Sequence, residues 1–308
     1  MLSNQLNKRK INFNKKVYNK RIIKRSYSQI NSNNTVQIVS NLRLSRKFEG
    51  REELVKKASV KQLHQMFATV VPPSAPLLLL AGNIGKPSDH IYYNFIEYCS
   101  KNFSKIFVVP GFDELCEDDP NANYQKLRNY NKSHTQLKNI MGSHSNTFYL
   151  NNKICSLTDD YDIIGITFGS RKYFNVLEAC VDLCTYEIDP ELPNYLDEIF
   201  RPNLEKLKEL IKDQADSDPT KKLLIMSDFV PKDVSCELKT NPNYSGLHQS
   251  YLELQNLVKN NSNIKIWASG DDPFESVVSD FVNLLHANYD HYDDKFPKKP
   301  VTLNLSHY

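Results

Sequence analysis

Features that would identify a membrane protein or a disulfide-bonded protein are missing from this 308-residue sequence. Its strongest apolar run, Leu77–Ala81, is far shorter than the roughly 20 residues that a membrane-spanning helix requires. Its six cysteines include no Cys-x-x-Cys pair, so we expect reduced thiols and neither a disulfide framework nor a zinc site. Hydrophobic residues make up 40% and charged residues 24% of the chain, which predicts an ordered globular fold without a membrane span.

Acidic residues are also absent from the first part of the chain, where Glu49 is the first one. Nine basic residues lie between Met1 and Tyr27. The rest of the chain holds 30 basic and 36 acidic residues, a formal charge of −6, although the total is +3. The basic charge therefore belongs to an N-terminal leader, and the body of the protein is mildly acidic.

The leader and its Asn-rich linker, residues 1–34, have the composition of a mitochondrial transit peptide. Four apolar residues lie roughly on one side of a helix: Leu2, Leu6, Phe13 and Val17. The segment Arg25-Ser26-Tyr27-Ser28 resembles a matrix-peptidase site, and cleavage there would start the mature chain at Ser28. We therefore expect import into the mitochondrial matrix. The alternative is a cytoplasmic protein whose basic arm contacts nucleic acid or another acidic surface.

Strand and helix patterns alternate through the rest of the chain. Short apolar or alternating segments predict strands at 36–40, 77–81, 106–109, 222–226, 264–268 and 301–305, with two or three more within 147–166. Amphipathic stretches predict helices at about 51–69, after Pro87, and at 121–141, 172–185, 193–213 and 247–259. This order predicts one α/β domain over residues 35–308 with largely parallel strands.

Five of the predicted strands run into polar loops. These loops are Asn41–Arg43, Gly82–Gly85, Pro110–Glu114, Ser227–Pro231 and Gly270–Pro273. Only nine glycines occur in the chain, and four of them lie in these loops. In open α/β sheets, ligands bind outside the carboxyl ends of the strands, where glycine permits tight turns close to a ligand. One such loop would be an ordinary turn, but five in this order favour a functional edge.

In their order and position these loops resemble the motifs of the calcineurin-like metallophosphoesterase family. Those motifs are Asp-x-His, Gly-Asp, Gly-Asn-His-Asp/Glu, a Thr-His-His-x-Pro-like element and Gly-His-x-His. The strongest local similarity covers Leu77–Gly85 and Tyr98–Gly111, and a looser one covers most of residues 35–305. The resemblance implies a four-layer αββα fold, in which two mixed β-sheets form a sandwich flanked by helices. It would also imply a two-metal phosphoesterase, provided that the ligands were present.

Most of the family's metal ligands and catalytic residues are replaced in this sequence. The replacements are Asn41 and Arg43 for the Asp and His of the first motif, Asn83 for the bridging Asp of the second, Phe112 and Asp113 for the Asn and His of the third, Asp228 for a His of the fourth, and Asp271 and Pro273 for the two His of the last. The loop glycines, Glu114 and Pro231 are retained.

These replacements remove the means of holding two divalent ions close together. Such a site needs a bridging anionic oxygen, and Asn83 offers only a neutral amide. Arg43 places a fixed positive charge where a ligand belongs. We therefore expect no cofactor, and a catalytically impaired protein that acts in binding or scaffolding with protein partners, in a mitochondrial assembly. A salt-bridged cluster of Arg43 with Asp113, Asp228 and Asp271 would take the place of the metals.

Two alternatives stay open. Asp113, Asp228 and Asp271 offer oxygen ligands for one divalent ion (Mn²⁺, Mg²⁺ or Ca²⁺), so the chain could be an active phosphoesterase with a non-standard metal site. If the basic arm is retained, the protein could instead be a nucleic-acid or ribonucleoprotein component. N-terminal sequencing of the native protein separates the last case, because a start near Ser28 discards nine positive charges.

The leader hypothesis is testable with the leader alone. A fluorescent reporter carrying residues 1–35 at its N-terminus should accumulate in mitochondria, because the segment is basic, free of acidic residues and amphipathic. Replacing Arg21, Lys24 and Arg25 by Gln should reduce import. A diffuse cytosolic signal from the unaltered fusion would contradict the hypothesis.

Overall fold

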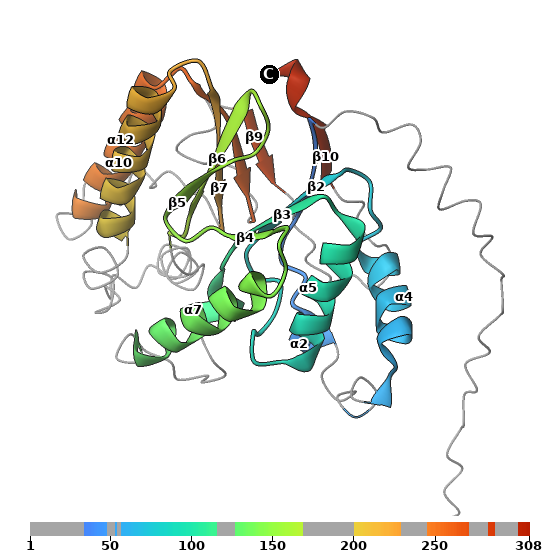
Figure 1. The fold of residues 1–308 in the computed structure, drawn as a ribbon. Coiled ribbons are helices and arrows are strands. Elements are labelled where there is room, and N and C mark those ends of the chain that lie inside the picture. Colours follow the sequence, from blue (N-terminus) through green and yellow to red (C-terminus); the bar gives the residue numbers. More distant parts are fainter. Residues whose placement is uncertain are drawn as a thin grey trace, which may run out of the picture. The chain divides into compact units, whose positions relative to one another are not determined.

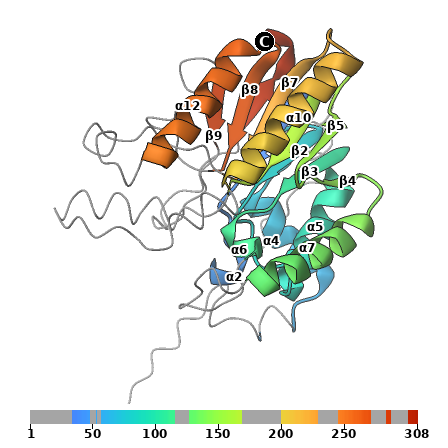
Figure 2. The ribbon, with the colours of Figure 1, turned by 90° about the vertical axis from the view of Figure 1, so that its left-hand side faces the viewer.

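The computed structural model describes residues 34–47, 53, 57–115, 127–168, 200–228, 245–270, 283–286 and 301–308. These residues form two five-stranded sheets that lie face to face between helices (Figures 1 and 2). The fold class predicted from the sequence, a sandwich of two mixed sheets flanked by helices, is therefore confirmed. The leader, the predicted helix at 172–185 and the start of the helix predicted at 193–213 lie outside the described residues.

The first sheet has the strand order β10-β1-β2-β3-β4, and the second has the order β5-β6-β7-β8-β9. The strands of the first are β1 (Thr35–Val39), β2 (Leu77–Ala81), β3 (Lys105–Val109), β4 (Thr147–Tyr149) and β10 (Val301–Asn304), and those of the second are β5 (Lys153–Ser156), β6 (Tyr161–Ile166), β7 (Lys222–Ser227), β8 (Ile264–Ser269) and β9 (Asn283–His286). Pairing is parallel throughout, except that β10 runs antiparallel to β1 and β5 antiparallel to β6. Within each sheet, the carboxyl ends of the parallel strands therefore lie at one edge.

Helices cover the outer face of each sheet (Figure 2). The described helices are α2 (Leu44–Lys47), α4 (Val60–Val70), α5 (His90–Asn102), α6 (Phe112–Leu115), α7 (Leu127–Gly142), α10 (Arg201–Ser217), α12 (Ser245–Asn260) and the 3₁₀ helix η4 (Leu305–His307). Helices α4, α5 and α7 lie on the side of the first sheet, and α10 and α12 lie on the side of the second (Figures 1 and 2). Within the described residues, no helix combines the length and the apolar composition needed to cross a membrane.

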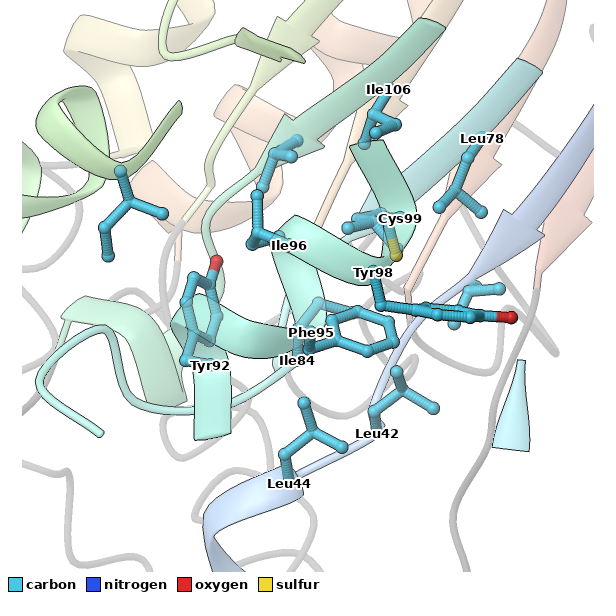
Figure 3. Close-up of a cluster of buried hydrophobic side chains, with 14 of the residues drawn as sticks. Leu42, Leu44, Leu78, Ile84, Tyr92, Phe95, Ile96, Tyr98, Cys99 and Ile106 are labelled. Atoms are coloured by element: carbon cyan, nitrogen blue, oxygen red, sulfur yellow. The ribbon is translucent and has the colours of Figure 1, made fainter. Parts of the chain in front are cut away.

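The alternation of side chains along the strands divides the core in two. On β2, Leu78 and Leu80 pack into a cluster with the helices, whereas Leu77 and Leu79 pack into a second cluster between the sheets. All five residues of β2 are buried, because a strand covered on both faces turns neither set of side chains to water. Figure 3 shows part of the first cluster, where side chains of α5 lie against Leu78 and Ile106.

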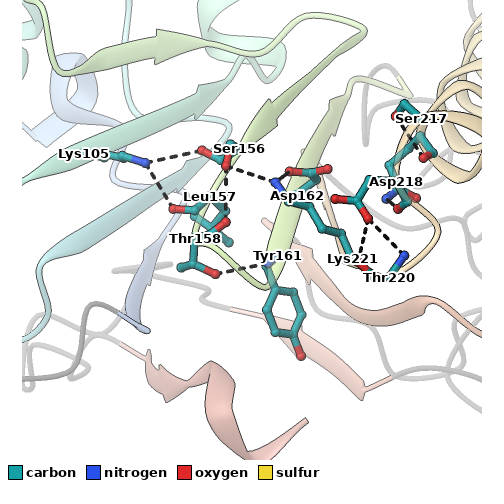
Figure 4. A network of polar contacts seen from close by, with 11 residues as sticks. Lys105, Ser156, Leu157, Thr158, Tyr161, Asp162, Ser217, Asp218, Thr220 and Lys221 are labelled. Carbon is teal, nitrogen blue, oxygen red and sulfur yellow. Dashed lines mark hydrogen bonds and ion pairs between the residues drawn. The ribbon is translucent and has the colours of Figure 1, made fainter.

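Two lysine side chains lie at the edge of the sandwich where β3 and β7 begin (Figure 4). Lys105, at the start of β3, points its Nζ toward the carbonyl oxygens of Ser156 and Leu157 at 3.5 and 3.3 Å. Beside it, Lys221 forms an ion pair with Asp162 at 2.9 Å. Lys105 thus joins the two sheets, whereas the ion pair of Lys221 joins β6 to the start of β7 within the second sheet. The strand ends that carry the predicted functional loops lie at the opposite edge.

Glycine is required where β6 approaches the first sheet most closely. A Cβ atom on Gly165 would overlap the Cβ of Leu150 and lie 2.9 Å from both the Leu150 carbonyl oxygen and Val109 Cγ2. Neither contact can relax without moving β6 away from β3 or from the end of β4. The spacing between the sheets therefore depends on this position.

Gly165→Ala should lower the free energy of unfolding by about 2–3 kcal/mol, because the added methyl group overpacks a buried backbone contact. Gly142→Ala is the matched control, since a Cβ there meets nothing within 4 Å. That variant should be unchanged or more stable by up to about 1 kcal/mol, through higher helix propensity. Urea unfolding of both variants measures the difference, and equal stabilities would contradict the packing argument.

Candidate functional site

The loops that follow β1 and β2 run side by side beyond the first sheet. Three backbone hydrogen bonds join them: Asn41 N to Gly82 O at 3.1 Å, Arg43 N to Asn83 O at 2.9 Å, and Leu44 N to Ile84 O at 2.8 Å. These bonds continue the parallel pairing of the two strands past their ends. The side chains of these loops therefore start from backbones that are already fixed relative to each other.

Left-handed backbone conformations give these loops their shape. Asn41, Arg43 and Asn83 have φ angles of 51°, 47° and 56°, and Gly82 has a φ of 76°. Glycine and asparagine adopt this region with little difficulty, whereas for arginine it costs about 1 kcal/mol or more. The surrounding hydrogen bonds must hold Arg43 in this conformation. Arg43, whose backbone is strained, is also one of the residues that the sequence analysis predicts at the site.

A buried carboxylate holds the β2 loop against the β3 loop. Glu114, on α6, is 1% exposed and accepts four backbone N–H groups. The donors are Gly111 at 2.8 Å and Asn83 at 2.9 Å on Oε2, and Ile84 at 2.6 Å and Gly85 at 3.3 Å on Oε1. Hydrogen bonds to an ionised carboxylate are about twice as strong as neutral ones, so these four bonds offset the free-energy cost of burying the Glu114 carboxylate. The same bonds hold the two loops in place.

The amide of Asn41 connects the first sheet to the loop after β8. Its Nδ2 donates to the carbonyl oxygen of Gly270 at 2.5 Å, and its Oδ1 accepts from Asn83 Nδ2 at 2.8 Å. The hydroxyl of Ser40 donates to the same Gly270 oxygen at 2.8 Å. Because a carbonyl oxygen only accepts, it fixes which end of the Asn41 amide faces it. The side chain at this position therefore acts as a donor as well as an acceptor.

The loop after β7 lies against the same group of residues. Asp228 is 4% exposed, and its Oδ1 accepts the backbone N–H of Phe168 at 3.0 Å. A Cβ on Gly82 would lie 2.9 Å from the Cβ of Asp228, and one on Gly270 would overlap the carbonyl oxygen of Ala81. The backbones of the loops after β2, β7 and β8 therefore come into close contact between the two sheets. We call the assembled region, residues 40–43, 82–85, 110–115, 228 and 270, the loop edge.

The loop edge brings together part of the set that the sequence predicts. Asn41 and Asn83 are joined directly, the Arg43 backbone pairs with that of Asn83, and Asp228 packs beside Gly82. Helix α6 carries the backbone of Phe112 and Asp113 immediately after Gly111, but their side chains are outside what the structure describes. Asp271 and Pro273 also lie outside the described residues. The predicted salt-bridged cluster of Arg43 with three aspartates stays a prediction.

Sequence reasoning missed the residues that hold the edge together. Glu114 was noted as retained from the family pattern, without a role, and Ser40 and Phe168 were not considered. One signal could have pointed to Glu114: an acidic residue three positions after Gly111 can reach back to the amide of that glycine, as side chains do at helix starts. No pattern indicates that the same carboxylate also reaches residues 83–85.

The described residues contain no group of three or more His, Cys, Asp or Glu side chains placed to hold a metal ion. The side chains of Asp113 and Asp271 lie outside the described residues. Within the described residues, the loop edge offers amides and two buried carboxylates: Asp228, whose Oδ1 accepts from Phe168, and Glu114, which accepts four backbone N–H groups. These amides and carboxylates are hydrogen-bonded within the chain itself.

Comparisons with known proteins give limited further information. No family model matches the chain. An uncharacterised protein, L509 of Acanthamoeba polyphaga mimivirus, is 37% identical over 94 residues, which cover 30% of this chain and 31% of the viral protein. The match thus spans less than a third of that relative's length, and activities or partners of whole relatives cannot be transferred from it.

Two solved structures share the arrangement of the elements at low identity. One is a phosphopantetheinyl hydrolase from Mycobacterium tuberculosis, with 13% identity, a TM-score of 0.46, and coverage of 87% of this chain and 95% of that one. The other is a dimetal phosphatase from Danio rerio, with 12% identity, a TM-score of 0.39, and coverage of 82% and 86%. Both belong to metallophosphoesterase-type folds. At these TM-scores they carry no argument about chemistry, which must come from the residues of this chain.

Glu114→Gln should lower the free energy of unfolding by about 3 kcal/mol, because a Gln amide leaves two buried backbone N–H groups without an acceptor. Glu205→Gln, an exposed position on α10, is the matched control and should change it by no more than about 0.5 kcal/mol. Chemical unfolding checks the difference, and amide NMR shifts of Asn83 and Gly111 report the loss of the carboxylate. A stable Glu114→Gln variant with unchanged shifts would contradict the assignment.

Proposed function

We propose that this chain is a binding or scaffolding protein built on a metallophosphoesterase-type fold, and that hydrogen bonds hold its loop edge where enzymes of the family hold two metal ions. The proposal rests on the fold and on the chemistry of the residues at the strand ends. The observation that carries it is the Asn41 amide, which bridges Gly270 on one side and Asn83 on the other.

This amide bridge supports the proposal in two ways. A pair of divalent ions needs anionic oxygen between them, and neutral amides at positions 41 and 83 leave the repulsion between the ions uncompensated. In addition, the Asn41 amide makes hydrogen bonds at both ends within the chain. Buried polar groups that are satisfied in this way are stable without an ion. The edge is then ordered without metal ions, as a non-catalytic binding or scaffolding role requires.

We also propose, from the basic leader, that the protein is located in the mitochondrial matrix. A segment with nine positive charges and no negative ones fits import into the mitochondrial matrix, where the remaining domain would join an organellar assembly. The N-terminus of the native protein tests this part separately, since cleavage would start the mature chain near Ser28.

Asn41→Asp should lower the free energy of unfolding by about 1–3 kcal/mol, because a carboxylate cannot donate to the Gly270 carbonyl oxygen. Wild-type protein should bind no stoichiometric Mn²⁺ and should unfold at the same temperature with and without it. Asn260→Asp, an exposed position on α12, is the matched control and should change stability by no more than about 0.5 kcal/mol. Urea unfolding, elemental analysis and thermal unfolding with added Mn²⁺ are the measurements.

A metal-dependent result would support the alternative enzyme. Stoichiometric Mn²⁺ in purified wild-type protein, together with turnover of a generic phosphodiester that Asp228→Asn abolishes, would overturn the proposal. Turnover that survives Asp228→Asn would indicate a contaminating hydrolase.

A further inference from the structure

Four buried titratable residues lie on α7 or on elements beside it, and the proposed binding role uses only Glu114. They are His134 on α7, Tyr149 at the end of β4, Tyr92 on α5 and Glu114 on α6, with exposures of 6%, 8%, 0% and 1%. His134 Nδ1 and the Tyr149 hydroxyl share a hydrogen bond, and the two rings lie 5.8 Å apart. Figure 3 shows Tyr92 within the apolar cluster between the helices and the first sheet.

Electrostatic effects connect three of these residues. Burial raises the pKa of Tyr92 well above its ordinary value, and the charges of Glu114 and Tyr149 raise the pKa further. The Tyr92 hydroxyl is buried and makes no hydrogen bond within the described residues, so the connection to the loops runs through helix packing. Helix α7 packs against α6, and α6 carries Glu114, which accepts four backbone N–H groups of the loops. A movement of α7 can therefore reach the loops through α6.

His134 is the buried group on α7 that gains a charge when it is protonated. Burial lowers the pKa of His134 from 6.5 to about 4, and the charge of Lys138 on the same helix acts in the same direction. The titratable group in contact with the His134 ring is Tyr149 beyond β4, and Tyr92 and Glu114 lie on α5 and α6, which pack against α7. The Asn151 amide approaches the same ring nitrogen at 3.4 Å. A protonated His134 would place a charge in an apolar cluster and could no longer accept at Nδ1.

We propose that α7 is a proton-sensitive latch for the loop edge: protonation of His134 releases α7 from β4 and, through α6, weakens the hold of Glu114 on the loops after β2 and β3. Helix α7 packs against both β4 and α6, so its release removes support from the helix that carries Glu114. The inference depends on the Glu114 contacts and not on the proposed function, because the coupling is the same whether or not the edge binds a partner.

The direction of the pH effect follows from proton linkage. The pKa of His134 is lower in the folded protein than in an unfolded chain, so the released form binds more protons between pH 6.5 and 4. The free energy that holds α7 in place therefore falls as the pH decreases through this window. For a single proton, the equilibrium constant for release rises by at most about tenfold per pH unit.

Hydrogen–deuterium exchange on the full-length protein tests the latch. After correction for intrinsic rates, the amides of Asn83, Ile84, Gly85 and Gly111 should lose about tenfold in protection for each pH unit between about pH 6 and 4. At each pH, the same four amides should be less protected than the amides of β7 and β8, because release of α7 exposes the loops without global unfolding. Equal protection of the loop amides and the strands, or no loss at the four loop amides, would overturn the proposal.

A lysine variant keeps the test decisive even if changes at His134 disturb folding. Lys138→Gln, at an exposed position, removes a positive charge that opposes protonation, so the loss of protection at the loop amides should move to higher pH. Lys132→Gln, exposed on the same helix, is the matched control and should leave the transition where it is. An unchanged transition in Lys138→Gln would contradict the role of His134. His134→Gln, where it folds, should abolish the transition.

Discussion

The hydrogen bonds to the Glu114 carboxylate are the interaction on which the arrangement of the loop edge depends. A carboxylate that is 1% exposed would be costly to bury alone, yet four backbone N–H groups surround this one. Those groups come from two loops that are about thirty residues apart in sequence, so the same bonds that stabilise the charge also fix the loops. The conformation of Gly82 and Asn83, and through them the position of the Asn41 amide, follows from this contact.

The sandwich makes such a dense edge possible because the backbones of its loops can touch. Gly82 packs against Asp228 and Gly111, and Gly270 packs against the Ala81 carbonyl, so loops of the first sheet meet loops of the second with no side chain between them. Gly165 has the same role inside the sandwich. Four of the nine glycines in the sequence thus lie where two backbones come close together.

The strands were predictable, and the contacts between their loops were not. The run Leu77–Ala81 predicts a strand covered on both faces, and each of its residues is buried. The four-residue helix α2 and the strand β9 were missed, because segments this short leave little periodicity to detect. The role of Glu114 depends on the left-handed turn at Gly82 and Asn83, and a loop conformation of that kind is set by tertiary contacts. Resemblance to a family located Asn41 and Asn83, but only coordinates reveal that their side chains bond to each other.

The charge of the side chains at positions 41 and 83 has more influence on the binding of two divalent ions than the number of polar residues at the edge. Two divalent ions about 4 Å apart repel each other by about 16 kcal/mol at an effective dielectric constant of about 20, which is four times the value of about 4 kcal/mol for two unit charges. Carboxylates between and around the ions normally offset this repulsion. Asn41 and Asn83 carry no charge, and their hydrogen bond draws the two loops together where an ion would separate them. Among the described side chains of the edge, Asp228 and Glu114 keep a carboxylate, and both accept backbone N–H groups. An edge whose polar groups are satisfied by the chain itself is stable without metal ions, and this is the physical basis of the non-catalytic role that we propose.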